Sequence, residues 1–140
     1  MFDHQQTLGY LTAQLARIAA GRLREALAPH GLQPAQFTAL AEIAKAEGMT
    51  QKQLVERLDL EQPGVARTLA ALERLGWIER YALVGRSQGL WLTERARAVL
   101  PAALAAAETV DGALTASLTT TERAQLLDQL LQLVEAQPPA

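Results

Sequence analysis

The segment from Thr50 to Thr93 constrains the fold more than any other part of the chain, because it divides into two short helices and a hairpin. Thr50 and Gln53 have the spacing of a capping box, so a helix is expected to begin at Thr50. Pro63 suits the first turn of a second helix, where its missing N–H costs no hydrogen bond. Gly76 stands where a helix C-terminus favours glycine. Apolar residues define the buried sides: Leu54 and Leu58 in the first helix, Leu60 as an apolar plug in the turn, and Val65, Leu69 and Leu72 in the second helix.

Two short segments rich in strand-forming residues follow the second helix, at 77–81 and 89–92, with a loop over 82–88 between them. A helix, a tight turn, a longer helix and a hairpin in this order are the layout of a winged helix-turn-helix, expected here over residues 32–93. Such a lobe can lay its second helix in the major groove of DNA. The expected fold class is therefore mainly α, with a small β-hairpin wing.

The outward face of the second helix carries the chemistry that DNA recognition requires. At about 100° per residue, the side opposite the apolar stripe presents Arg67 and Arg74 among small residues. Small side chains allow close approach to a surface, so Arg67 can reach a guanine edge or a phosphate, and alanine methyls can meet thymine methyls. Gln62 at the N-terminal end can read adenine, and the free N–H groups there suit a phosphate. The alternative is an ordinary solvated helix face.

Arg86 at the tip of the loop suits the narrow, strongly negative minor groove, although the solubility of a loop tip would also explain an arginine there. The candidate DNA-binding residues are Thr50, Gln51, Gln62, Pro63, Ala66, Arg67, Ala70, Arg74 and Arg86. The formal net charge of −2 is unevenly distributed: six arginines face three glutamates over 62–97, whereas one arginine faces five carboxylates from residue 98 onward. The acidity therefore lies away from the candidate DNA surface.

Four further helices are expected around these elements. The first covers residues 5–28, and the second covers 34–47 with Gly48 as its stop. Residues 94–136 hold the last two helices, the second of which begins at a further capping box at Thr119. The whole chain of 140 residues is expected to form a single domain, residues 1–140.

The terminal helices carry more apolar surface than one chain of this size is expected to cover. The last helix is apolar on more than one side, through Leu126, Leu127, Leu130, Leu131, Leu133 and Val134. Pro101 lies inside the long helix that precedes the last one and is expected to kink it or to disturb its early turns. We expect 5–28 and 94–136 to join two chains in a homodimer, which would place two recognition helices on a pseudopalindromic site. The alternative is that both helices pack only on the core of their own chain.

A family resemblance rests on three runs in this region. The run LEQPGVARTL from Leu60 to Leu69 and the run LERLGWIER from Leu72 to Arg80 resemble the recognition helix and wing of the MarR family of bacterial transcriptional regulators, and the first is most similar to its SlyA-like branch. The pair Leu92-Thr93 resembles the end of that family's wing. The resemblance implies a homodimeric DNA-binding regulator, most often a repressor, that binds an operator in double-stranded DNA.

The resemblance also implies a small aromatic or phenolic anion as effector, bound between the dimer arms and the DNA-binding lobe. Candidate pocket residues are Arg22, His30, Phe37 and Trp77; for Phe37 and Trp77, simple core packing is the alternative. One departure from the family lies in the wing, where Val84-Gly85-Arg86 stands in place of Asp-Arg-Arg. The aspartate that braces the wing in the family is therefore missing, while one cation remains.

Other classes of protein find little support. The absence of cysteine excludes disulfides, thiolate metal sites and thiol-based redox sensing. His4 and His30 are the only histidines, neither has a catalytic partner at a known spacing, and no HExxH, P-loop or GxGxxG motif occurs. We therefore expect no enzyme, cofactor or metal. No transmembrane run or signal peptide is found near Met1, so a cytoplasmic protein is expected. A winged-helix module for protein contacts, with weak or no DNA binding, stays as the alternative function.

Overall fold

The computed structural model describes residues 1–58 and 60–139 of the chain, and within them the fold is mainly helical with one two-stranded hairpin. The elements in chain order are η1 (His4–Gln6), α1 (Leu8–Leu27), η2 (Ala28–His30), α2 (Pro34–Lys45), α3 (Gln51–Leu58), α4 (Gln62–Arg74), β1 (Ile78–Ala82), β2 (Gln88–Leu92), α5 (Glu94–Leu114) and α6 (Thr120–Glu135). This arrangement confirms the fold class that the sequence predicts.

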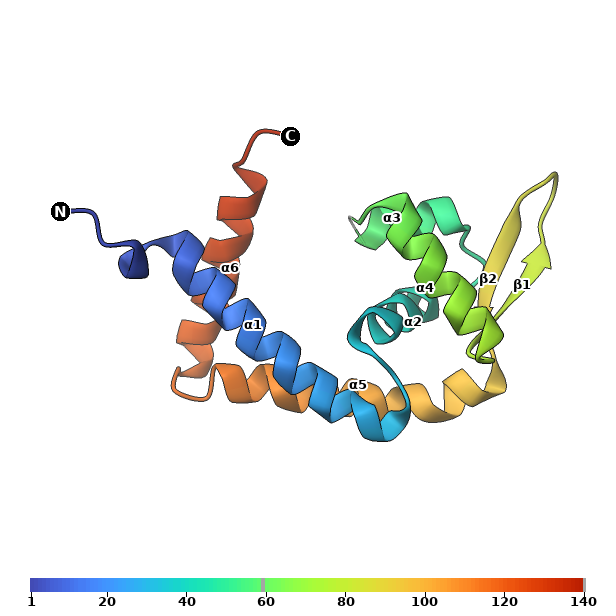
Figure 1. The fold of residues 1–140 in the computed structure, drawn as a ribbon, viewed down its shortest axis with the longest axis horizontal. Coiled ribbons are helices and arrows are strands. Elements are labelled where there is room, and N and C mark those ends of the chain that lie inside the picture. Colours follow the sequence, from blue (N-terminus) through green and yellow to red (C-terminus); the bar gives the residue numbers. More distant parts are fainter. Residues whose placement is uncertain (59, 140) are drawn as a thin grey trace.

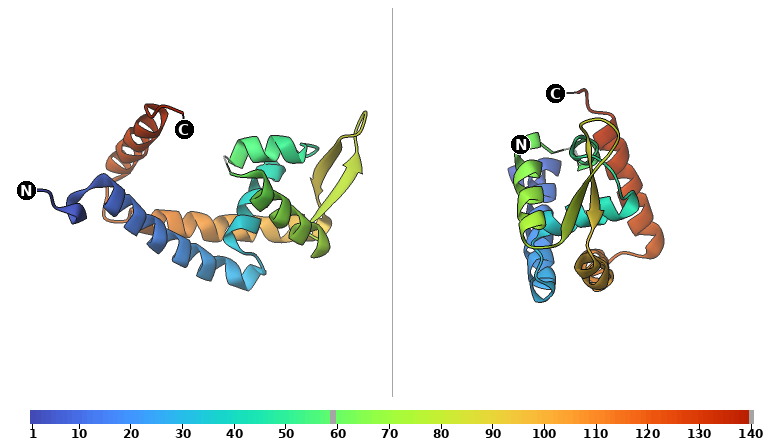
Figure 2. Two further views of the ribbon diagram at one scale, coloured as in Figure 1. Left: turned by 45° about the horizontal axis from the view of Figure 1, so that its top comes forward. Right: turned by 90° about the vertical axis from the view of Figure 1, so that its right-hand side faces the viewer.

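The two long helices α1 and α5 run side by side and carry the winged helix-turn-helix lobe at one end (Figure 1). The lobe consists of α2, α3, α4 and the hairpin, whose tip projects away from the helices. Both chain termini and α6 lie at the opposite end, as the two further orientations in Figure 2 also show. The terminal helices and the lobe are thus separate regions of one elongated molecule.

The local signals for helix ends are confirmed. The Thr50 hydroxyl accepts a hydrogen bond from the Gln53 backbone N–H at 3.2 Å, while the Gln53 side chain accepts from the Thr50 N–H at 2.9 Å. Gly76 ends α4 with a positive φ of 79°. The N–H of Trp77 donates to the Leu72 carbonyl, and the N–H of Gly76 donates to the Glu73 carbonyl, which together form a Schellman motif. These caps fix the length of α4 and the direction in which the wing leaves it.

Several boundaries differ from the prediction by a few residues. Helix α1 begins at Leu8, because the Thr7 hydroxyl caps its first turn after the separate turn η1. Helix α2 ends at Lys45, and Gly48, with φ of 96°, follows two residues beyond its C-cap. Helix α5 ends at Leu114 rather than near residue 117, and it runs through Pro101 as one helix. Each strand includes one more residue on the loop side than expected.

The prediction that Leu60 plugs the turn between α3 and α4 is wrong, because its side chain is 57% exposed. Leu60 precedes Glu61, the N-cap of α4, whose backbone is extended. The residues on either side of the turn that do enter the core are Leu54 and Val65, both buried, and Leu58 packs against the core cluster.

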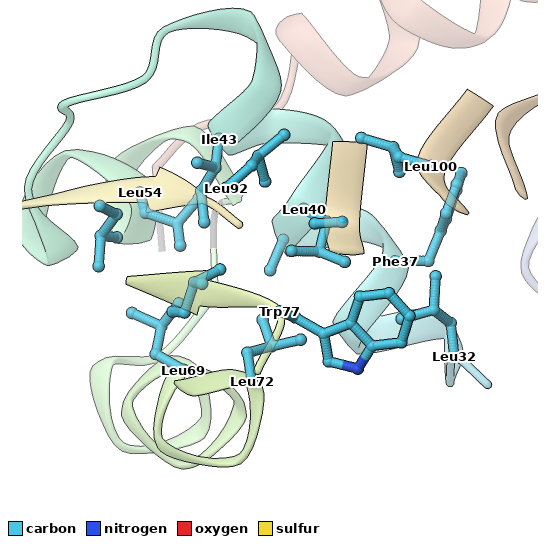
Figure 3. Packing of buried hydrophobic residues seen from close by; sticks show 14 of the residues in the cluster. Leu32, Phe37, Leu40, Ile43, Leu54, Leu69, Leu72, Trp77, Leu92 and Leu100 are labelled. Atoms are coloured by element: carbon cyan, nitrogen blue, oxygen red, sulfur yellow. The ribbon is translucent and has the colours of Figure 1, made fainter. Parts of the chain in front are cut away.

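The hydrophobic core lies within the lobe and joins it to the first half of α5 (Figure 3). The predicted stripe of Val65, Leu69 and Leu72 is buried, and Trp77 is 1% exposed at the centre of the cluster. Residues from α2, α3, β2 and α5 also belong to it, among them Phe37, Leu40, Ile43, Leu54, Leu90, Leu92, Ala96 and Leu100. Burial of these faces holds α4 with its opposite side turned outward.

The wing is held to the lobe by a short backbone bridge. Met49 pairs with Leu90, and Gly48 donates its N–H to the Leu90 carbonyl at 2.8 Å, so the residues before α3 extend the hairpin sideways. Gly89 lies at the centre of this junction. A Cβ atom built there would lie 2.6 Å from two atoms of the Trp91 ring and 2.8 Å from the Gly48 carbonyl oxygen.

Substitution of Gly89 by alanine is therefore expected to destabilise the fold by about 1–3 kcal/mol, the usual effect of overpacking a filled site. Urea denaturation followed by circular dichroism measures the difference. Gly112→Ala is the matched control, because a Cβ there meets no atom within 4 Å and alanine favours a helix. Equal unfolding midpoints for Gly89→Ala and the wild-type would contradict the crowding at this junction.

Candidate nucleic-acid interface

The outward face of α4 has the composition and exposure that the sequence predicts. Arg67, Ala70 and Arg74 are exposed, opposite the buried apolar stripe, and Gln62 and Pro63 are exposed at the N-terminal end. Ala66 is half-buried. Within the described residues, neither a hydrogen bond nor an ion pair engages the guanidinium groups of Arg67 and Arg74. The N-cap Glu61 makes no side-chain cap, so the first-turn N–H groups keep no side-chain partner.

The N-terminus of α3 contacts the wing through Arg80. Arg80 is two residues from the buried Ile78, so its side chain lies on the core-facing side of β1. Its guanidinium donates to the Gln51 side-chain oxygen at 3.3 Å and lies 3.6 Å from a carboxylate oxygen of Glu73. Gln51, predicted to contact DNA, thus also holds the wing against α3 and α4. The hydroxyl oxygen of Thr50 serves as a helix cap, which leaves its proton free to donate.

The wing tip is a tight turn. The N–H of Leu83 donates to the Ser87 carbonyl at 2.9 Å, and Gly85 adopts a positive φ of 85°. Arg86 is exposed, and no hydrogen bond or ion pair to another part of the described chain holds its side chain. The residue therefore stands at the tip with its charge available, as the sequence predicts.

A cleft of about 310 Å³ lies between the start of α3 and the wing, and we name it the α3–wing cleft. It is lined by Thr50, Gln51, Lys52, Arg80, Arg86, Ser87 and Gln88. The structure thus brings together three predicted residues from the two ends of the lobe. Sequence reasoning did not single out Lys52 and Arg80; the alternation of β1, which places Arg80 on the side of Ile78, is the signal that points to Arg80.

The C-terminal end of α4 is tied to the first turn of α5. The Thr93 hydroxyl donates to the Gly76 carbonyl at 2.7 Å. Arg95 donates to the Leu75 carbonyl, and its guanidinium lies 4.0 Å above the Trp77 ring, a cation–π contact. The recognition helix is therefore fixed to α5 at the point where the chain leaves the wing.

A second link joins α5 to the loop between α2 and α3. Arg97 donates two hydrogen bonds to the carboxylate of Glu47, at 2.6 Å and 2.7 Å. The same carboxylate accepts the backbone N–H of Leu92 at 2.9 Å. Arg97 and this N–H hold the pKa of Glu47 below its usual value. Arg95 and Arg97 of α5 thus contact the lobe at two separate places.

The four candidate effector residues lie in different environments. Phe37 and Trp77 belong to the hydrophobic core, close to Leu32 in Figure 3. Arg22 is exposed on α1, and His30 is half-buried in η2. None of the four lines the α3–wing cleft.

The terminal helices expose a wide apolar surface. Although all of α6 is described, none of its residues is buried within the chain. Exposed leucine and isoleucine side chains lie on α1 as well: Leu8, Leu11, Leu15 and Ile18. An open groove of about 440 Å³ runs between α1, the end of α5 and α6, lined by residues such as Leu15, Leu114 and Leu127.

Two properties of residues 1–58 and 60–139 bear on membrane and metal binding. No helix there is both long and apolar enough to cross a membrane. No group of three or more His, Asp or Glu side chains in this part of the chain is placed to hold a metal ion.

The fold and its outward-facing helix define a winged helix-turn-helix protein. A family model described as "MarR family" matches residues 30–86. An uncharacterized HTH-type transcriptional regulator from Bacillus subtilis, YwoH, is 39% identical over 67 residues, which cover 48% of this chain and only about half, 49%, of that relative. The HTH-type transcriptional repressor Rv2887 from Mycobacterium tuberculosis is 28% identical over 128 residues, covering 90% of this chain and 92% of that protein.

Solved structures of MarR-family proteins are similar to this chain over most of its length. A mutant of MarR from E. coli, in complex with operator DNA, has a TM-score of 0.86 at 25% identity, over 94% of this chain and 99% of that one. Rv2887 in complex with salicylic acid has a TM-score of 0.72 at 27% identity, over 93% and 98% of the two chains. The match to the MarR family model over residues 30–86 and the similarity to these structures confirm the resemblance that the sequence shows. The similarity to the SlyA-like branch rests on the sequence run alone.

Proposed function

We propose that this protein is a homodimeric repressor that binds a pseudopalindromic operator in double-stranded DNA and releases it when a small aromatic or phenolic anion binds. The observation that carries the proposal is the outward face of α4, where two unpaired arginines stand among alanines beside a wing with Arg86 at its tip. Arginine and alanine at these positions match the edges of guanine and the methyl of thymine. E. coli MarR, similar over nearly its whole length, was solved with operator DNA.

Duplex binding at several salt concentrations tests the proposal. A sequence-specific DNA-binding protein is expected to protect one site in its own promoter region from cleavage. The logarithm of its affinity for the duplex should fall linearly with the logarithm of the salt concentration. Protection at no site, with duplex affinity independent of salt, would favour the alternative of a protein-contact module. The departure of the wing from Asp-Arg-Arg is the observation that supports this alternative.

Dimerisation is part of the proposal and rests on the terminal helices. Because α6 buries no residue against its own chain, its apolar side chains need a second surface. The groove between α1, α5 and α6 continues the same apolar region. A repressor that binds an operator would act in the cytoplasm, which is the location that we propose.

The effector part of the proposal rests on the relative Rv2887, which was solved with salicylic acid, a phenolic carboxylate. Arg22 and His30 are the residues that could pair with such a carboxylate, while Phe37 and Trp77 would contribute apolar contact if the core opens beside them. Salicylate titrated into a protein–operator complex tests this part. Release of the duplex, weakened in Arg22→Ala and His30→Ala, is the expected result; no release at any concentration would remove the effector from the proposal.

Arg86→Ala is expected to lower the affinity for operator and for unrelated duplexes by similar factors, because a single cation in the minor groove contributes little sequence choice. We expect the tip of the wing, residues 83–87 between the paired strands, to be mobile without DNA and to order when Arg86 enters the groove, at a cost in conformational entropy. Fluorescence anisotropy on both duplexes measures the affinities. If Arg86→Ala changes neither affinity, the wing does not bind DNA.

Val84→Asp restores the family's brace and is expected to tighten binding to both duplexes. Adding Gly85→Arg, to restore the neighbouring arginine, would complicate the comparison. Gly85 has a positive φ of 85°, and a side chain there costs about 1–2 kcal/mol of strain. Unchanged affinity for Val84→Asp would mean that the missing aspartate does not limit this wing.

A further inference from the structure

The α3–wing cleft is a second concentration of positive charge, separate from the outward face of α4. Three of its lining side chains are cations, Lys52, Arg80 and Arg86, and no carboxylate lines it. Its volume is about 310 Å³. This is close to the lower limit for small-ligand pockets, which is roughly 300 Å³. Such a cleft suits an anion rather than an apolar or cationic ligand.

The donors around the cleft are ones that bind phosphate oxygens. Ser87 offers a hydroxyl and Gln88 an amide, and Thr50 retains a hydroxyl proton after capping α3. The backbone N–H groups of Gln51 and Lys52 belong to the first turn of α3, where no helical carbonyl can accept them. Neutral and charged donors from the start of α3, the middle of β1, the wing loop and the first residue of β2 therefore line one space.

Arg80 is held in place before any ligand arrives. Its guanidinium is fixed on one side by Gln51 and on the other by Glu73, which itself does not line the cleft. A cation already fixed loses little side-chain entropy when it binds. Lys52 and Arg86, both exposed, add charge from the two opposite walls.

The position of the cleft identifies the source of the anion. With α4 in a major groove and Arg86 in the neighbouring minor groove, the protein must straddle the sugar–phosphate strand that separates the two grooves. The α3–wing cleft is bounded by the helix-turn-helix on one side and by the wing on the other. We propose that the α3–wing cleft binds a backbone phosphate of the DNA, with Lys52 and Arg80 as its principal cations; this rests on the proposed function.

Lys52→Ala is the test variant, because the side chain is exposed and alanine favours a helix. In the proposed dimer the variant loses the contact in both half-sites, so the slope of log affinity against log salt should fall by about 1.8, which is about 0.9 for each phosphate contact. Relative to the wild-type, the loss of affinity should then be about sixtyfold greater at 0.1 M salt than at 1 M. Operator and unrelated duplex should lose the same factor. Lys45→Ala is the matched control: an exposed lysine of the same lobe that pairs with Glu42 and does not line the cleft.

Each other outcome overturns the proposal in a distinguishable way. A wild-type protein that binds no duplex overturns both the proposed function and the phosphate site. A wild-type that binds, with Lys52→Ala unchanged in slope or weakened only on the operator, overturns the phosphate site alone. A third arm compares melting temperatures in inorganic phosphate and in chloride at equal ionic strength. Stabilisation by phosphate that Lys52→Ala loses, with duplex binding intact, would mean that the cleft takes a free anion instead of DNA.

Discussion

Arg67→Ala should abolish specific operator binding while leaving the fold intact. The side chain is exposed on α4 and makes no contact that stabilises the described chain, so its loss removes only what it does outside the protein. A bidentate contact between an arginine and a guanine contributes about 1–3 kcal/mol of discrimination, and a dimer would lose it in both half-sites. Gel-shift titrations with operator and with an unrelated duplex should show affinities that converge.

Arg57→Ala provides the matched control, because Arg57 is an exposed arginine of the same lobe that faces Glu42 rather than the outward side of α4. It removes the same charge from the same lobe. Operator affinity unchanged by Arg67→Ala, or reduced equally by both variants, would refute the assignment of Arg67 to base recognition.

Introduction of a charge into the apolar face of α6 should separate the proposed dimer. Leu131 is 55% exposed within the chain, so Leu131→Glu would cost little in a monomer but would bury an unpaired charge in an interface. Light scattering at micromolar concentration is expected to give about twice the chain mass of 15.1 kDa for the wild-type and a smaller or aggregated species for the variant. Truncation near Thr119, which removes α6, should aggregate or unfold.

Gln129→Glu adds the same charge to the same helix, two residues away on its polar side, and should leave the dimer intact. A well-folded monomer from the truncation, or a wild-type mass equal to one chain, would rule out this dimer. A dimeric Leu131→Glu variant would place the interface elsewhere.

Local signals in the sequence were sufficient for most of the fold. Capping boxes at Thr50 and Thr119 and the glycine at Gly76 act through neighbouring backbone groups, so their effect can be read from a few residues. The outward face of α4 follows from periodicity alone. Leu60 shows where this reasoning ends, because the direction of a turn residue depends on which neighbours already fill the space beneath it.

Parts of the candidate site depend on contacts between distant segments, which a single sequence does not reveal. Arg80 reaches Gln51 across 29 positions, and the bridge between Met49 and Leu90 helps to bring the two segments together. For the same reason, Phe37 and Trp77 could not be assigned to a core or to a pocket by residue type. An aromatic side chain serves either purpose, and the packing around it decides which.

The two arginine links between α5 and the lobe couple the position of the lobe to the tilt of the helix. Because Arg95 and Arg97 hold the lobe at two points, its orientation follows the first turn of α5. The helix has 21 residues and is therefore about 30 Å long. A tilt of about 6° at its far end would displace the lobe by about 3 Å, close to the rise of roughly 3.4 Å per base pair. In the proposed dimer, a small adjustment at the interface would thus suffice to move a recognition helix away from its half-site.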